Sequence, residues 1–102
     1  MPYLIYAIDR EGVEKVREDL REAHRSHLKS AGSRLLASGA LLDEDGVTII
    51  GGLSILDTSS KREAQHFADT DPYSVANIRK ETVVVQWRRR WLDGQFLGDV
   101  DV

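Results

Sequence analysis

The chain has 102 residues, of which 41% are apolar and 30% charged, and its formal net charge is −3. A composition of this kind at this length predicts one globular domain over residues 1–102, without the basic surface that attracts nucleic acid or anionic membranes. Because the sequence has no cysteine, disulfides, thiolate nucleophiles and cysteine-bound metals are excluded. No apolar run approaches the roughly 20 residues of a membrane helix, and no signal peptide is recognisable. We therefore expect a cytoplasmic protein.

The first segment, residues 3–8, is rich in β-branched and aromatic side chains and predicts a buried strand. From Gly12 the apolar period changes to 3.6 residues, which predicts one amphipathic helix closed by Gly32. The charged residues, Arg25 among them, are expected to face away from the core. The predicted apolar face comprises Val13, Val16, Leu20, Ala23, His24, His27 and Ala31.

Residues 34–42 predict a second strand, and residues 47–56 predict its hairpin partner after a tight turn at Asp45-Gly46. The pair Gly51-Gly52 within the third strand indicates a bulge or a close approach by a ligand or another backbone. Ser60 and Glu63 form a capping-box pattern that begins a second helix, and this helix is predicted to end at Asp71-Pro72. Residues 82–87 predict the last strand.

The order β-α-β-β-α-β predicts an α+β, ferredoxin-like subunit, in which both helices lie on one face of an antiparallel sheet. The other face would remain uncovered, so we expect a second copy to pack against it as a homodimer. Residues 88–102 are predicted to be a C-terminal tail. The arginines Arg88 to Arg90 are expected to be solvated, with no nucleic-acid partner, and residues 94–102 to be mobile or to lie along the dimer partner.

Several motifs make the sequence similar to the YCII family of YciI-like proteins. They are Ile5-Tyr6-Ala7, Arg21-Glu22-Ala23-His24, Ser38-Gly39-Ala40-Leu41, Asp45-Gly46 and Phe67-Ala68-Asp69-Thr70-Asp71-Pro72-Tyr73. The resemblance implies a dimeric α+β barrel and a pocket that holds a His–Asp dyad, whose members would be His24 and Asp71. It also implies lyase or dehydrochlorinase chemistry for some members. The chain departs from the family pattern at Arg25, where leucine is typical, and at Gly52, where serine is common.

His24 and Asp71 each have two interpretations. A histidine on the apolar side of a helix is often structural, but an imidazole titrates near pH 6.5 and suits a general base. An aspartate before Pro72 is a common turn residue, yet its carboxylate could orient and charge the imidazole.

The other candidates also keep two interpretations. Arg21 either binds a substrate carboxylate bidentately or is a solvated or aspartate-paired arginine. Tyr73 either donates its hydroxyl to the ligand or packs. His27 packs against the sheet or lines the pocket, and His66 is expected to be exposed. No third ligand accompanies His24 and His27, so we expect no metal.

The leading hypothesis is a small enzyme that performs elimination or isomerisation on a small organic acid. In it His24 is the base, Asp71 its orienter, Arg21 the anion anchor and Tyr73 a further substrate contact. No phosphate or dinucleotide loop is present, so no organic cofactor is expected. The first alternative is a non-catalytic module that binds a small ligand or a protein, and the second is a monooxygenase of the same barrel type. Ser54 lacks the surroundings of a nucleophilic serine.

Overall fold

The structure is a computed structural model that describes residues 1–99. Its elements are β1 (Tyr3–Asp9), α1 (Glu14–Asp19), α2 (Arg21–Lys29), the 3-10 turn η1 (Gly32–Arg34), β2 (Leu35–Leu42), β3 (Ile49–Leu56), α3 (Lys61–Asp69), α4 (Pro72–Val75), β4 (Arg79–Gln86), β5 (Trp91–Leu92) and β6 (Gln95–Phe96).

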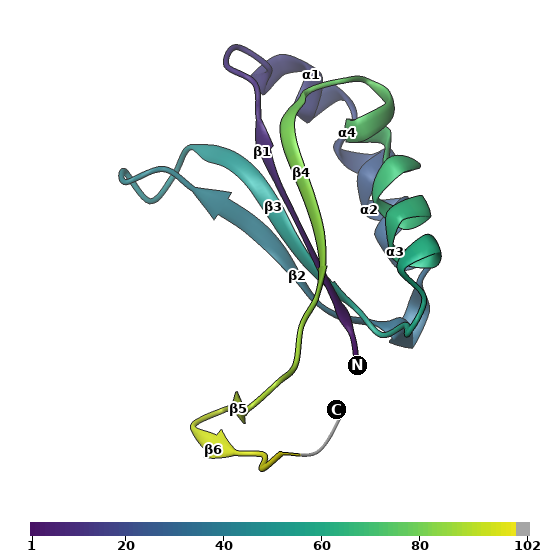
Figure 1. Cartoon of the computed structure of the whole chain (residues 1–102). Helices are drawn as coiled ribbons and strands as arrows, with labels where there is room; N and C mark the ends of the chain where they lie inside the picture. Colours follow the sequence, from purple (N-terminus) through teal and green to yellow (C-terminus); the bar gives the residue numbers. More distant parts are fainter. Residues whose placement is uncertain (100–102) are drawn as a thin grey trace.

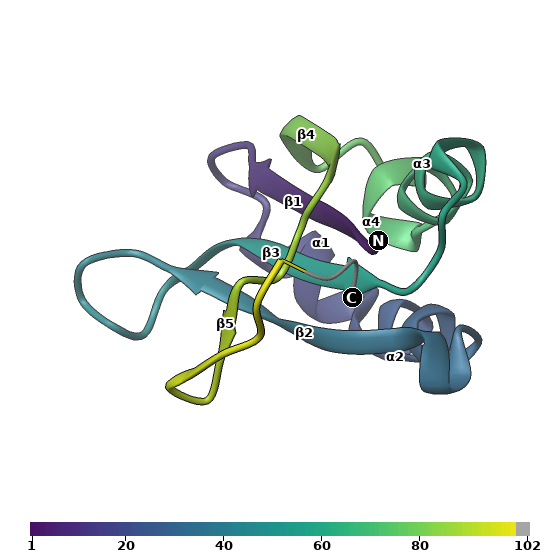
Figure 2. The same cartoon turned by 60° about the horizontal axis from the view of Figure 1, so that its bottom comes forward.

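The main sheet has four strands in the order β2-β3-β1-β4, and every neighbouring pair is antiparallel. The four helices lie together on one face of this sheet (Figure 1). The β2–β3 hairpin extends beyond the helices (Figure 2). The predicted α+β, ferredoxin-like fold is therefore confirmed.

The core lies between the sheet and α3. Alternate residues of β1 point to opposite faces, and Tyr3, Ile5 and Ala7 are the buried set. Ala64 and Ala68 of α3 are also buried, and these small residues let the helix approach the sheet closely. The core is thus concentrated on the β1–β4 half of the sheet.

The predicted first helix is divided into two. Leu20 adopts φ −97° and ψ 3°, which interrupts the helix between α1 and α2. The predicted apolar face is also only partly correct, because Val16 is 40% exposed and Ala23 is exposed. No glycine or proline marks this break, so the sequence pattern gave no sign of it.

The turn and cap predictions are confirmed. Gly46 has φ +71° in the β2–β3 turn, and the Ser60 side chain accepts a hydrogen bond from the Glu63 N–H. Gly51 lies where another backbone comes close: a Cβ there would stand 2.0 Å from the carbonyl oxygen of Ala7. Only glycine fits at this position, where β3 pairs closely with β1.

The C-terminal segment holds structure that the sequence pattern did not predict. β5 and β6 form a small hairpin that stands away from the helices (Figure 1), with the rings of Trp91 and Phe96 5.2 Å apart. Residues 100–102, also part of the predicted mobile or partner-bound tail, lie outside the described residues. Among the helices within residues 1–99, none is long and apolar enough to cross a membrane.

Candidate active site

A cavity of about 610 Å³ lies between α2 and the β2–β3 half of the sheet. Its floor consists of small residues at helix-facing positions of these strands, namely Ser38, Ala40, Gly52 and Ser54. Because these side chains are small, they do not fill the space beneath the helix as Ile5 does on β1. The volume is typical of a site for a small organic molecule.

The helical wall of the cavity is charged. Glu14, Glu18 and Arg25, which were expected to face away from the core, line this cavity together with Arg21 and His24. The side chains of Glu14, Glu18 and Arg25 are all exposed, so they do not face the core, but the sequence pattern did not indicate the open cavity that they line.

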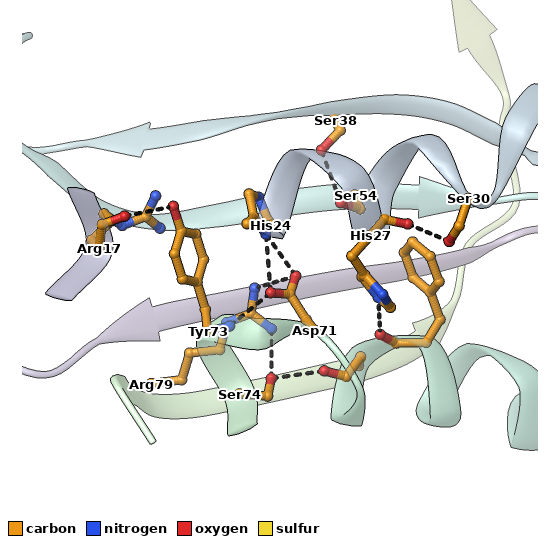
Figure 3. A network of polar contacts seen from close by, with 12 residues as sticks. Arg17, His24, His27, Ser30, Ser38, Ser54, Asp71, Tyr73, Ser74 and Arg79 are labelled. Atoms are coloured by element: carbon orange, nitrogen blue, oxygen red, sulfur yellow. Dashed lines mark hydrogen bonds and ion pairs between the residues drawn. The ribbon is translucent and has the colours of Figure 1, made fainter. Parts of the chain in front are cut away.

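His24 and Asp71 meet beside this cavity although 47 residues separate them (Figure 3). Nδ1 of His24 lies 3.0 Å from Oδ1 and 2.9 Å from Oδ2 of Asp71. A carboxylate can only accept, so Nδ1 carries the hydrogen and donates it. Within residues 1–99 no hydrogen bond is made to Nε2 of His24, and a neutral ring in this tautomer leaves Nε2 with a free lone pair.

Asp71 also has a structural role. Its geometry therefore agrees with both interpretations of the sequence, a turn residue before Pro72 and a carboxylate that orients the imidazole. The side chain caps α4 by accepting from the Tyr73 N–H at 2.9 Å. Its oxygen Oδ2 also accepts from Arg79 at 3.2 Å. Burial on its own would raise the pKa of this carboxyl. The hydrogen bond from His24, the charge of Arg79 and the Tyr73 N–H outweigh burial and hold the pKa below its ordinary value.

Arg79 is the member of this network that the sequence analysis missed. Its side chain is only 10% exposed, and besides Asp71 it donates to the hydroxyl of Ser74 at 2.9 Å. Arg79 is the first residue of β4, eight positions after Asp71, and nothing in the local strand pattern signals the contact. The structure therefore shows a chain of contacts from His24 through Asp71 to Arg79.

Tyr73 forms part of the cavity wall. Its ring stacks on that of His24 at 4.2 Å with an interplanar angle of 20°, and its hydroxyl donates to the backbone carbonyl of Arg17 at 3.1 Å. Burial raises the pKa of the Tyr73 hydroxyl above 10.0, so the group stays a donor at neutral pH. The hydroxyl hydrogen is already used within the protein, which favours the packing interpretation.

The two arginines nearest Tyr73 differ in what they contact. Arg17 lies over the Tyr73 ring, 4.4 Å from its centroid, and pairs with Asp9 at 2.9 Å. Arg21 is exposed and lines the cavity, and within residues 1–99 its guanidinium has no hydrogen bond or ion pair. Arg21 is thus the cation that remains available to an anionic ligand.

The other two histidines lie apart from the dyad. His27 donates from Nε2 to the Phe67 carbonyl at 2.8 Å and stacks on the Phe67 ring at 4.4 Å, so it ties α2 to α3. His66 is exposed, as predicted. Among residues 1–99, no group of three or more histidine, aspartate or glutamate side chains is arranged to hold a metal.

Comparisons with known proteins show to which family the chain belongs. The family model of the YCII-related domain matches residues 1–88. The chain belongs to the YCII family. The predicted resemblance is therefore confirmed, and residues 89–99, with the β5–β6 hairpin, lie beyond the matched region. No curated protein matches the chain significantly.

The chain is similar to solved structures, of which one is an enzyme bound to a small molecule. It is the 5-chloro-2-hydroxyhydroquinone dehydrochlorinase TftG of Burkholderia phenoliruptrix AC1100, in complex with 2,5-dihydroxybenzoquinone. The likeness has a TM-score of 0.77 at 28% identity, over 86% of this chain and 94% of TftG. A protein of Arabidopsis thaliana is more distant, with a TM-score of 0.47 and 11% identity over 90% of this chain and 97% of that one.

Proposed function

We propose that this protein is an acid–base enzyme of the elimination or isomerase type that acts on a small organic acid or phenol. The observation that carries the proposal is the contact between Nδ1 of His24 and the carboxylate of Asp71. This contact fixes the tautomer that leaves Nε2 as the basic nitrogen beside the cavity.

Each residue of the site has its own role in the proposed reaction. Arg21 attracts the anionic group of the substrate, and the stacked ring of Tyr73 holds the imidazole of His24 in place. In an elimination, Nε2 takes a proton from the substrate, and the released electron pair forms a new double bond. The leaving group departs with its own pair of electrons. The ionised Asp71 stabilises the imidazolium that forms.

The likeness to TftG supports the elimination chemistry, because that protein is named a dehydrochlorinase and its complex holds a small oxygenated ring. The contacts of the dyad support it independently of the likeness. The non-catalytic alternative uses the same cavity, and it differs in predicting binding without turnover.

We further propose that the open face of the sheet pairs with a second copy of the chain. Side chains on this face include Leu4, Tyr6 and Val83, which are only partly buried, and Val85, which is 48% exposed. Sedimentation at micromolar concentration should give about twice the chain mass of 11.5 kDa. Val85→Glu should shift the mass toward the monomer, and a wild type that sediments as a monomer would contradict the pairing.

Two measurements on the wild type separate an enzyme from a binding module. Calorimetry with 2,5-dihydroxybenzoquinone tests whether the cavity binds a small oxygenated ring. Chloride release from 5-chloro-2-hydroxyhydroquinone, against a blank without protein, tests for elimination. We expect binding in the first and release above the blank in the second. Binding without release of chloride would favour the non-catalytic module.

A further inference from the structure

The floor of the cavity carries a pair of hydroxyl groups that the proposed mechanism does not use. Ser38 on β2 and Ser54 on β3 are directly opposite each other, and their Oγ atoms lie 3.0 Å apart (Figure 3). Both residues line the same cavity as His24 and Arg21. We propose that this serine pair is a second binding point, which holds a neutral hydroxyl or carbonyl oxygen of the ligand.

The position of the pair argues against a purely structural role. The same row of the sheet continues from Ser38 and Ser54 to Ile5 and Val84, which pack with the core under α3. β-branched apolar residues are the ones that stabilise strands at such helix-facing positions. Two hydroxyls here contribute little to packing and leave the space beneath α2 open.

The count of hydrogens shows what the pair can bind. Two hydroxyls carry two hydrogens, and one of these makes the contact between Ser38 and Ser54. Within residues 1–99 the second hydrogen has no acceptor, so it is available to an oxygen in the cavity. Each hydroxyl oxygen also accepts, so the pair suits a ligand hydroxyl as well as a carbonyl.

The charges in the cavity set the orientation of the ligand. Among the arginines that line the cavity, Arg21 on the helical wall is the one without an ion pair within residues 1–99, whereas the serine pair on the floor is neutral. An anionic group therefore goes toward Arg21, and a neutral oxygen goes toward the serines. This inference rests on the proposed function, and it narrows the ligand to a small organic acid that carries a second, uncharged oxygen.

The test compares three probes: benzoate, which has no hydroxyl, and 3-hydroxybenzoate and 4-hydroxybenzoate, which carry one hydroxyl at different positions of the ring. Dissociation constants come from amide shifts in NMR titrations of the wild type, Ser38→Ala, Ser54→Ala and the double variant. Ser26→Ala is the matched control, because Ser26 is exposed on α2 and does not line the cavity. The amide spectrum also verifies that each variant is folded.

We expect the wild type and Ser26→Ala to bind at least one hydroxybenzoate about three- to tenfold more tightly than benzoate, which is the range for one added hydrogen bond. The double variant should lose this preference and keep its affinity for benzoate. If the double variant does not fold, the exposed Ser38→Ala alone should reduce the preference. A wild type with no preference, or with no binding of any probe, would overturn the proposal.

The same titration separates this proposal from the catalytic one. His24→Gln should retain the preference for the hydroxylated probe, because the serine pair is intact. A protein that shows the preference but turns over no substrate would refute the catalytic role of His24 and support the serine site. A preference that survives in the double variant would refute the serine site alone.

Discussion

Arg79 contacts the same carboxylate oxygen of Asp71 that Nδ1 of His24 contacts, at 3.2 Å and 2.9 Å respectively. The two charges of Arg79 and Asp71 balance each other while the imidazole is neutral. The guanidinium of Arg79 is 10% exposed, and its charge helps to hold the pKa of Asp71 below the ordinary value. Arg79 therefore keeps Asp71 in the ionised form that accepts from Nδ1 of His24.

Replacing Arg79 should raise the pKa of Asp71. In Arg79→Gln the positive charge beside the carboxylate is gone, so the pKa of Asp71 should rise, whereas Arg79→Lys should stay nearer the wild type. An NMR titration that follows the carboxyl carbon of Asp71 measures this shift. A loss of stability with an unchanged pKa of Asp71 would mean that Arg79 is only structural.

The carboxylate of Asp71 should stabilise the fold in a pH-dependent way. Its pKa lies below the ordinary value of 3.8, so its contribution is complete above that value and is lost as the pH falls through the lowered one. Asp71→Asn leaves Arg79 buried without its anion and should lower the free energy of unfolding at pH 7 by about 3 kcal/mol.

Urea unfolding of both proteins between pH 7 and pH 2.5 measures this contribution. The difference between wild type and Asp71→Asn should shrink as the pH falls below about 4, because the wild-type carboxyl then becomes protonated. A difference that stays constant over this range would show that the ionised form is not the stabilising one.

The fold was predictable wherever a local signal determined it. The turn at Gly46 and the cap at Ser60 depend on a few adjacent residues, and both were found. The break at Leu20 carries no such signal. It was missed because the residues around Leu20 would also suit one continuous helix.

The site was predictable only in part. His24 and Asp71 were identified because their motifs resemble those of the YCII family, whereas periodicity alone favoured a structural histidine. Arg79 was missed because its role depends on the tertiary position of Asp71. The cavity that Glu14 and Arg25 line was also missed, because hydrophobic periodicity indicates which side of a helix packs against a core and not where the packing leaves a space.

Gly51 and Gly52 should respond oppositely to substitution. Gly51→Ala would place a methyl group 2.0 Å from the Ala7 carbonyl oxygen and should lower the free energy of unfolding by about 3 kcal/mol or more. Gly52→Ala meets only the Gly39 carbonyl oxygen at 3.5 Å and should change stability by less than about 1 kcal/mol. Thermal melts of the two variants would contradict this account if Gly51→Ala were the better tolerated.

The hydroxyl of Tyr73 should matter for stability more than for turnover. Tyr73→Phe removes the hydrogen bond to the Arg17 carbonyl and should cost about 1 kcal/mol of unfolding free energy. The stacked ring beside His24 remains, so kcat per folded molecule should stay within about twofold. A fall in kcat of a hundredfold would instead assign the hydroxyl to the substrate.

The assignment of His24 as the base is tested by the rate of chloride release from 5-chloro-2-hydroxyhydroquinone by His24→Gln, measured beside the wild type and Ser26→Ala. Glutamine retains a polar group on α2 but cannot accept a proton at neutral pH. We expect release above the blank for the wild type and Ser26→Ala, and only the rate of the blank for a folded His24→Gln. Release by His24→Gln at the wild-type rate would contradict the assignment of His24 as the base.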